Sequence, residues 1–202
     1  LSGYSDPSLL HTYSGERQEI AQNLIDFDKE WSGLMAAKPE DLPSKGYVAE
    51  FYTKTFEFPS GFMTEYKPSQ LTTDNAHQNI AKGYTIGKRF KSAKVSRVSD
   101  TNPLELGHLH EADGRWRIYV FGDEKASTDA TNGANTFGEW LGTHEDSPVL
   151  KYTRSAEDTN SVFDVKVIYQ QPKEEIELME TPAIFRPAVG PFQLTDLNHV
   201  FG

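Results

Sequence analysis

The sequence predicts an α/β protein, because two apolar strand patterns flank a helical pattern in its second half. Residues 116–121 and 161–171 alternate as β-strands do, and residues 134–144 between them carry large apolar side chains at helical spacing. Strand, helix and strand in this order predict at least one right-handed βαβ crossover. A separate and longer helical pattern lies near the start of the chain, at residues 15–36.

The first predicted helix, residues 15–36, shows the clearest period. Its apolar residues recur every three or four positions and form one broad stripe. They are Ile20, Leu24, Phe27, Trp31, Leu34 and Met35. Residues 14–17 supply cap-type side chains, which predicts that the helix begins there. Segment 38–46, with two prolines and a final glycine, is predicted to be a linker, and the aromatic-rich segment 47–58 a second helix.

Short strands are predicted between residues 62 and 121. Segment 62–71 is typical of a strand with a turn, and segment 83–100 of a loop followed by a strand. Two further strand candidates flank the turn at residues 112–114. The second of them, residues 116–121, is apolar on both faces, which predicts a central strand covered on both sides.

In the last third of the chain, apolar and polar residues alternate less regularly. In segment 161–171 the polar residues Asp164 and Lys166 alternate with apolar neighbours before the segment becomes fully apolar, as in a strand. Pro172 and the glutamates after it are typical of the start of a short helix over residues 172–180. Residues 194–202 show no pattern of a further element.

Composition restricts the possible partners. The chain has 202 residues, enough for one domain or for one domain and part of another, and 37% of them are hydrophobic. Its formal net charge of −10 would repel nucleic acids and anionic membranes. Cysteine is absent, which excludes disulfides, thiolate metal sites and a Cys nucleophile. The absence of a glycosylation sequon favours the cytoplasm, and we expect neither nucleic acid nor membrane as a partner.

One cluster of metal-ligating residue types is present. His108 and His110 lie two positions apart, with Glu111 and Asp113 close behind. On a strand, positions i and i+2 project to one face, where two imidazoles and a carboxylate could hold a metal ion. The alternative interpretation, which we favour in the absence of a further ligand, is a polar strand end that runs into a turn.

Two basic segments raise the possibility of anion binding. Arg115 and Arg117, after the Asp113-Gly114 turn, could clamp an anion, but alternating arginines at the edge of a strand explain the same pattern. Segment 83–91, "GYTIGKRFK", is basic and contains glycine. It matches neither the dinucleotide-binding nor the P-loop pattern, and no helix clearly follows it.

No set of residues in the sequence matches a known catalytic motif. A nucleophile elbow, a zinc-protease motif and a carboxylate pair of defined spacing are all missing. The acidic run at residues 174–180 is most simply a solvated helix face. We therefore assign no catalytic, cofactor-binding or metal-binding residue to this chain.

Three stretches together resemble a family of enzymes. Segment 9–27, "LLHTYSGERQEIAQNLIDF", is similar to the L-L-x-T-Y-x-x-E-R-x-x-x-A segment that ends the FAD domain of aromatic hydroxylases of the para-hydroxybenzoate hydroxylase type. The matching residues are Leu9, Leu10, Thr12, Tyr13, Glu16, Arg17 and Ala21. Segments 86–100 and 113–123 resemble stretches of the C-terminal domain in the phenol 2-monooxygenase branch. The aromatic-rich segment 58–66 and the spacing between the stretches also fit that branch.

The resemblance implies an enzyme that uses FAD and NADPH to place an oxygen atom on a phenolic ring. It also implies a C-terminal domain with a thioredoxin-like fold that takes part in dimerisation. Residues 1–36 would then be the last helix of the FAD-binding domain and residues 37–75 a connecting segment. Residues 76–202 would be the thioredoxin-like domain without its closing hairpin, so that the sheet would keep an open edge.

The family's flavin-binding motifs have no counterpart in residues 1–202, so the resemblance transfers no flavin-binding or catalytic residue to this chain. It predicts instead that the chain is part of a longer monooxygenase, cytoplasmic and homodimeric, and that it binds no cofactor alone. Two alternatives stay open. The first is a self-contained, non-catalytic thioredoxin-like dimerisation or interaction module. The second is a small metal-binding enzyme built on His108 and His110.

Overall fold

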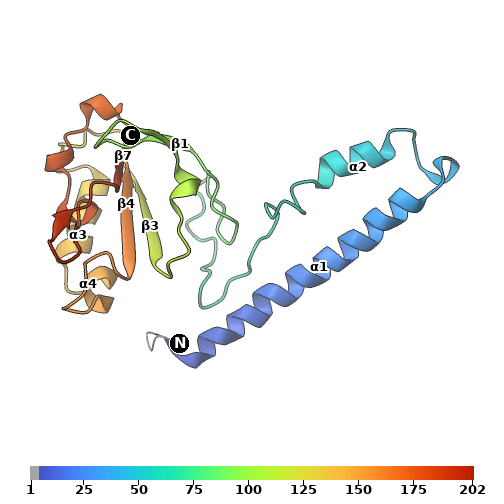
Figure 1. Ribbon diagram of the computed structural model, residues 1–202, viewed down its shortest axis with the longest axis horizontal. Coiled ribbons are helices and arrows are strands. Elements are labelled where there is room, and N and C mark those ends of the chain that lie inside the picture. Colours follow the sequence, from blue (N-terminus) through green and yellow to red (C-terminus); the bar gives the residue numbers. More distant parts are fainter. Residues whose placement is uncertain (1–4) are drawn as a thin grey trace. The chain divides into compact units, whose positions relative to one another are not determined.

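A computed structural model describes residues 5–202, and the chain divides into two units. The first unit ends at Lys91, and the second comprises Ser92–Gly202. The first contains the helices α1 (His11–Ala36) and α2 (Tyr47–Thr55), and the second contains all the named strands (Figure 1).

Helix α1 (His11–Ala36) confirms the long helix predicted from the apolar period. Its predicted start at residues 14–17 is wrong, because a 3-10 turn, Pro7–Leu10, runs directly into the helix. The side chain of Asp6 caps that turn by accepting a hydrogen bond of 2.8 Å from the backbone N–H of Ser8. The cap therefore lies further toward the N-terminus than the first polar residues suggested.

Helix α2 (Tyr47–Thr55) confirms the second predicted helix and turns back along α1 (Figure 1). Aromatic rings fill the contact between them: the ring of Phe27 lies 6.2 Å from that of Phe51 and 5.2 Å from that of Phe58, between centroids. None of the residues described in α1 or α2 is fully buried. On the apolar stripe of α1, Leu24 is 52% exposed, so α2 covers the stripe only in part.

The strand predicted over residues 62–71 is wrong. The structure has a single isolated bridge there, between Glu65 and Lys88. The backbone N–H of Tyr66 donates to the carbonyl of Gly87 at 2.9 Å. Gly87 has φ +81°, and a Cβ atom would lie 2.4 Å from the carbonyl oxygen of Tyr66. Glycine thus permits two loop backbones to cross at one point, and a ladder does not extend from it.

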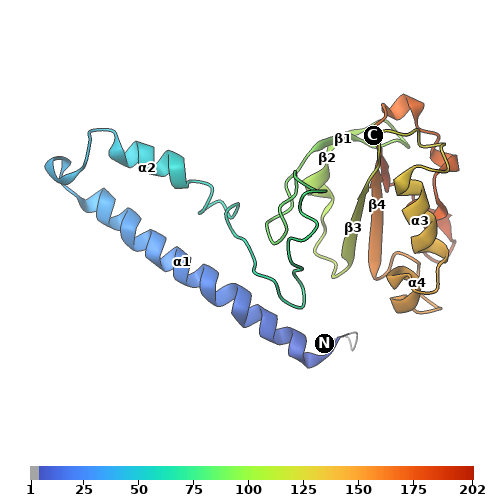
Figure 2. The ribbon, with the colours of Figure 1, turned by 180° about the vertical axis from the view of Figure 1, so that it is seen from behind.

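The second unit is built on three parallel strands in the order β3–β4–β7. They are β3 (Trp116–Phe121), β4 (Phe163–Ile168) and β7 (Val200–Phe201). Helices α3 (Gly133–Thr143) and α4 (Pro148–Tyr152) connect β3 to β4. Figure 2 shows both helices on the same side of this sheet. The α/β class and the strand–helix–strand unit are therefore confirmed.

The prediction that residues 116–121 form the central strand is wrong. Strand β4 lies between β3 and β7, while β3 pairs only with β4 among the named strands. Burial agrees, because four of the six residues of β4 are buried and only Val120 is buried in β3. The pattern of residues 116–121 correctly predicts a strand, but the pairing of that strand is decided by residues far away in the sequence.

Two smaller antiparallel pairs complete the second unit. Strands β1 (Lys94–Ser96) and β2 (Pro103–Glu105) form one, so the hairpin predicted around residues 112–114 does not exist. Strands β5 (Ala188–Val189) and β6 (Leu194–Thr195) form the other. Both β6 and β7 lie in the final segment, for which the sequence pattern predicted no element.

Strand β7 also contacts the first pair. The backbone N–H of Ser96 donates to the carbonyl of Gly202 at 2.8 Å, and that of Val98 donates to the carbonyl of Val200 at 3.0 Å. The helix predicted over residues 172–180 is replaced by two 3-10 turns, Lys173–Glu175 and Leu178–Glu180. Each turn is too short to continue as an α-helix.

The main core lies between the sheet and α3. Its buried members come from β3, β4, α3, α4, β7 and the segment between β4 and β5. They are Val120, Ala134, Leu141, Val149, Val165, Val167, Tyr169, Ile176, Ile184, Phe185 and Val200. The first turn of α3 is capped by Asn132, whose side chain accepts from the N–H of Ala134. Close packing in this layer depends on one glycine of α3.

Replacing Gly138 with alanine is expected to destabilise the second unit. A Cβ atom at this position would lie 2.7 Å from two ring atoms of Phe185, a side chain with no exposed surface. Overpacking of about 1–3 kcal/mol should exceed the gain of about 1 kcal/mol that alanine normally brings to a helix. Denaturant unfolding measures the difference. Gly142→Ala is the matched control in the same helix, since its nearest neighbour lies at an ordinary 3.5 Å. An increase in stability for both variants would contradict the prediction.

Candidate functional site

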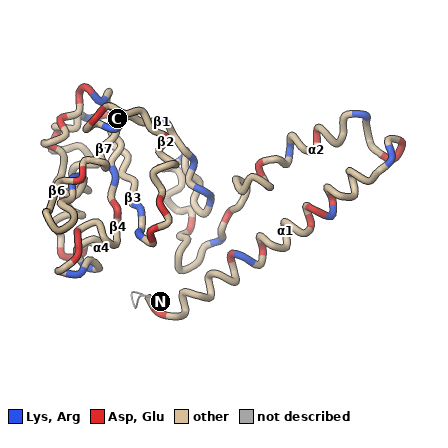
Figure 3. Tube along the Cα trace, in the orientation of Figure 1, with Lys and Arg blue, Asp and Glu red and all other residues tan. Residues whose placement is uncertain are grey.

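The face of the sheet opposite the core carries a buried ionic cluster. Val120, Val165 and Val167 point toward α3, so strand alternation places Arg117, Asp164 and Lys166 on the other face. His199, directly before β7, joins them. We call Arg117, Asp164, Lys166 and His199 the Asp164 cluster. Acidic and basic positions on β3 and β4 are marked in Figure 3.

Asp164 is the common partner in this cluster. One carboxylate oxygen, Oδ2, lies 2.5 Å from Lys166 Nζ and 3.3 Å from Arg117 Nε. The other, Oδ1, accepts a hydrogen bond from His199 Nε2 at 2.8 Å. All four side chains are at most 9% exposed. A single carboxylate is thus shared by side chains of β3, β4 and the segment leading to β7.

The surroundings of Asp164 favour its charged form. Burial by itself would raise the pKa of this carboxyl. Hydrogen bonds from His199 and Lys166, together with the charge of Lys166, outweigh burial and hold the pKa well below its usual range. Burial lowers the pKa of the Lys166 amine, and the salt bridge to Asp164 opposes that effect. The salt bridge therefore favours the charged form of both Asp164 and Lys166.

The stability of the second unit should fall on acidification. The pKa of Asp164 is lower in the folded chain than in the unfolded one, so its contribution is complete above about pH 4 and is lost as pH falls further. One such group gives a slope of up to about 1.4 kcal/mol per pH unit. Urea unfolding from pH 6 to pH 2 measures this slope, which should be smaller in Asp164→Asn. An equal slope in both proteins would contradict the assignment.

The two histidines singled out in the sequence do not form a metal site with their acidic neighbours. His108 lies in a 3-10 turn, Leu106–Leu109, so strand geometry does not align it with His110. His110 Nδ1 lies 3.0 Å from the carbonyl of Gly107, and its ring packs edge-on against Tyr119. Over residues 5–202, no group of three or more His, Cys, Asp or Glu residues is arranged to hold a metal ion.

Arg115 and Arg117 are occupied by Asp113. The turn itself has Gly114 at φ +81°. The carboxylate of Asp113 accepts from the Nε of Arg115 at 2.7 Å and from both terminal nitrogens of Arg117 at 2.6 and 2.7 Å. Hydrogen bonds from Arg117 and Arg115 lower the pKa of Asp113. The arginines thus stabilise the turn rather than form an open anion clamp.

The basic segment 83–91 is likewise engaged. Lys88 pairs with Glu65 at 3.3 Å, the guanidinium of Arg89 lies 4.9 Å from the ring centroid of Phe62, and Tyr84 stacks on Phe90. These contacts hold a loop in place. They do not arrange successive backbone N–H groups around a phosphate.

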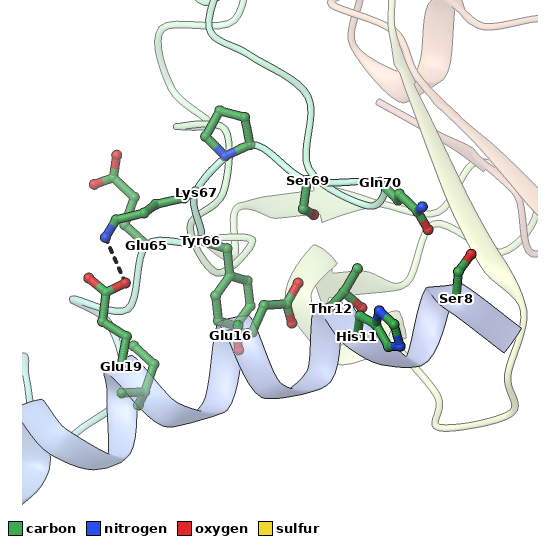
Figure 4. A pocket seen from close by; sticks show the side chains of 13 residues that line it. Ser8, His11, Thr12, Glu16, Glu19, Glu65, Tyr66, Lys67, Ser69 and Gln70 are labelled. Carbon is green, nitrogen blue, oxygen red and sulfur yellow. Dashed lines mark ion pairs between the residues drawn. The ribbon is translucent and has the colours of Figure 1, made fainter.

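A hollow of about 430 Å³ lies in the first unit, between the start of α1 and segment 65–70 (Figure 4). Figure 4 shows Glu16 and Glu19 of α1 facing this segment. Lys67 Nζ lies 2.8 Å from Glu19 Oε2, and the guanidinium of Arg17 lies 5.2 Å from the ring centroid of Tyr66. The hollow is rich in carboxylates, which would repel an anionic cofactor. Its contacts attach the loop to the helix.

The family model for the phenol hydroxylase C-terminal dimerisation domain matches residues 64–202, more than half of the chain. The chain belongs to this family. The recognition from segments 86–100 and 113–123 is therefore confirmed. The match includes the entire second unit and the end of the first.

Characterised relatives of this dimerisation-domain family are monooxygenases by name. The chain is 40% identical over 199 residues to a 3-hydroxybenzoate 4-monooxygenase of Comamonas testosteroni, covering 96% of this chain and 31% of that protein. It is 30% identical over 208 residues to an FAD-dependent monooxygenase of Aspergillus terreus, covering 100% and 34%. A phenol 2-monooxygenase of Aspergillus fumigatus is 28% identical over 191 residues, covering 93% and 30%. The chain spans about a third of the length of these curated relatives.

The Asp164 cluster is the part of this dimerisation-family chain that sequence reasoning missed. Asp164 and Lys166 were visible as the polar half of an alternating strand, which is the usual pattern of a solvated face. Their burial depends on Arg117 and His199, which lie 47 and 35 residues from Asp164 in the sequence. One signal in the sequence could have indicated the cluster. The segment that forms β4 carries Asp164 and Lys166 on one face, although its other residues are as apolar as those of a central strand.

The structure also contains no helix, over the described residues 5–202, with the length and apolar character needed to cross a bilayer.

Proposed function

We propose that this chain is the C-terminal part of an FAD-dependent monooxygenase that hydroxylates a phenolic ring. The single observation that carries the proposal is the family match over residues 64–202, supported by 40% identity to a 3-hydroxybenzoate 4-monooxygenase. NADPH is the proposed reductant, phenol-to-catechol hydroxylation the proposed reaction type and the cytoplasm the proposed location. This part of the enzyme supplies dimerisation and domain packing.

Within that enzyme we assign residues 1–36 to the last helix of the FAD-binding domain, 37–75 to a connecting segment and 76–202 to a thioredoxin-like domain. Residues 1–4 of the first range lie outside the described part of the chain. The parallel β3–β4 pair joined through α3 and α4 supports the thioredoxin-like assignment. The apolar stripe of α1, which α2 covers only in part, supports a further packing partner for that helix.

The residues described here do not fit an FAD site. A flavin dinucleotide needs backbone N–H groups or cationic side chains for its pyrophosphate. The hollow beside α1 presents Glu16, Glu19 and Glu65, and its one lysine, Lys67, is paired with Glu19. The start of α3 is capped by Asn132, and the backbone N–H of Gly133 donates a further hydrogen bond to Asp123 Oδ2 at 3.0 Å, so protein side chains fill that position. We derive no catalytic step through these residues.

Titration of free FAD with the purified chain, followed by flavin fluorescence, tests the assignment. We expect no tight binding, because the pyrophosphate-binding elements would have to lie elsewhere in the enzyme. Stoichiometric binding by the chain alone would contradict it. The relatives serve as the positive control, since a full-length FAD-dependent monooxygenase must bind the flavin in the same assay.

The second candidate is a self-contained, non-catalytic dimerisation module. The separate core of the second unit favours it. The intact mass of the polypeptide in its source separates the two: roughly three times the 22.7 kDa of this chain supports the monooxygenase, and 22.7 kDa supports the module.

A further inference from the structure

The β5–β6 hairpin presents two large apolar side chains to solvent. Phe192, in the turn, is 82% exposed, and Leu194, at the start of β6, is 66% exposed. In the second unit no other phenylalanine or leucine for which an exposed fraction is given reaches these values. Val189 pairs with Leu194 across the hairpin and so shares its face. Exposed aromatic residues at ordered positions are the usual anchors of protein–protein interfaces.

The turn that carries Phe192 is held firmly. The backbone N–H of Gly190 donates to Asp158 Oδ2 at 2.9 Å, and Gln193 Nε2 donates to the carbonyl of Gly190 at the same distance. Gln193 adopts φ +48°, a left-handed conformation that its hydrogen bonds help to stabilise. Because the turn is already ordered, contact through Phe192 costs little further conformational entropy.

The hairpin carries no charge that would oppose contact with a second copy of this chain. A twofold dimer places the same patch of both protomers against itself, so a patch with one sign of charge repels its copy. The chain has a net charge of −10, yet the nine residues 187–195 contain no charged side chain. This surface can meet its own copy without like-charge repulsion.

A second exposed aromatic row, on α3, is less suited to self-contact. Phe137 stacks on Trp140 with ring centroids 5.9 Å apart, and Trp140 on His144 at 5.6 Å. Two acidic residues, Glu145 and Asp146, directly follow His144. Apposing this row on its copy would bring these carboxylates together, so it provides the comparison surface.

We propose that the β5–β6 hairpin is the apolar centre of a homodimer interface, with Phe192 and Leu194 as its anchors. The inference rests on the proposed dimerisation function and specifies its surface. An open hollow of about 540 Å³ lies beside the turn, and its lining includes Pro191 and the acidic residues Glu157 and Asp158. Both carboxylates are engaged within the protomer, since Glu157 accepts from Ser161 Oγ at 3.2 Å and Asp158 accepts from the backbone N–H of Gly190 at 2.9 Å. In a twofold arrangement, each Phe192 ring lies against the hollow of the other protomer, and the polar segment around Asp158 forms the rim.

Sedimentation equilibrium of the chain and three variants tests this surface. Phe192→Asp should raise the dimer dissociation constant about 30-fold or more, as expected when a charge replaces an interface anchor. Leu194→Asp should act in the same direction. Phe137→Asp, an aromatic-to-acid change on the comparison surface, should leave the constant within about threefold. Circular dichroism and the unfolding midpoint check the fold, which the change at an 82% exposed residue should preserve.

The outcomes separate this inference from the proposed function. A dimer that persists in Phe192→Asp and Leu194→Asp overturns the hairpin surface but leaves dimerisation standing. A dimer lost only in Phe137→Asp assigns the interface to α3 instead. A wild-type chain that remains monomeric up to millimolar concentration overturns both the surface and the dimerisation function.

Discussion

Replacing Asp164 with alanine should destabilise the second unit by about 3–5 kcal/mol. The substitution leaves the amine of Lys166 and the imidazole of His199 buried without their shared carboxylate. Arg117 loses its weaker contact at 3.3 Å and keeps its pairing with Asp113. Removal of one partner from a buried ion pair is costly because the remaining charge has lost both its solvent and its partner. Thermal and urea unfolding, followed by circular dichroism, measure the loss.

The matched control for this change is Asp146→Ala. The carboxylate of Asp146 is 76% exposed and lies 3.9 Å from His144, so its removal should change the free energy of unfolding by no more than about 0.5 kcal/mol. The double variant Asp164→Ala/Lys166→Met should recover part of the loss, because it also removes one unpaired charge. A loss below about 1 kcal/mol in Asp164→Ala would show that the cluster contributes little to stability.

Truncating Phe185 to alanine should cost a similar amount, about 3–5 kcal/mol, for a different reason. The ring has no exposed surface and packs on the glycine face of α3 at Gly138. Its removal loses buried apolar area and leaves a cavity that the parallel sheet and helix cannot fully close. Met179→Ala, at a side chain 69% exposed in the same segment, is the control and should have little effect.

A double-mutant cycle makes this test sharper. In the Phe185→Ala background, Gly138→Ala no longer meets the ring and keeps only its contact with Pro182 Cβ at 3.1 Å, so the added methyl group should destabilise the second unit much less than it does in the parent chain. The two substitutions should therefore be non-additive by more than about 1 kcal/mol. Additive effects would indicate that the two residues do not contact each other in solution.

Elements with a strong local period were predictable from the sequence, whereas pairing was not. Helix α1 and helix α3 follow directly from the spacing of their apolar residues, which recur at helical intervals. Strand β3 was recognised as a strand but placed at the centre, because its sequence does not contain the residues of β4 that decide its position. Local pattern specifies which residues are strand, and distant residues specify the order.

The contrast between local pattern and distant pairing also explains which candidate sites could be predicted from the sequence. The short spacing of His108 and His110 suggests a metal site, but that hypothesis requires strand geometry and His108 lies in a 3-10 turn. The Asp164 cluster could not be predicted, because its members come from three separate segments and meet only when β7 pairs with β4. The two-residue strand β7 could not be predicted from periodicity, since two residues contain no period.

Strand β7 also has a consequence for the order of folding. Its backbone joins β4 on one side and residues 96–98 on the other, and the bridge between Arg97 and Phe201 connects positions roughly a hundred residues apart. Such a connection carries a large loop-closure entropy and forms late. During synthesis, the segment at residues 94–105 must therefore wait for residues 200–202 to emerge from the ribosome before this edge of the second unit can close. Until then the β1–β2 pairing is the only strand contact that the structure gives this segment, and its remaining edge is open.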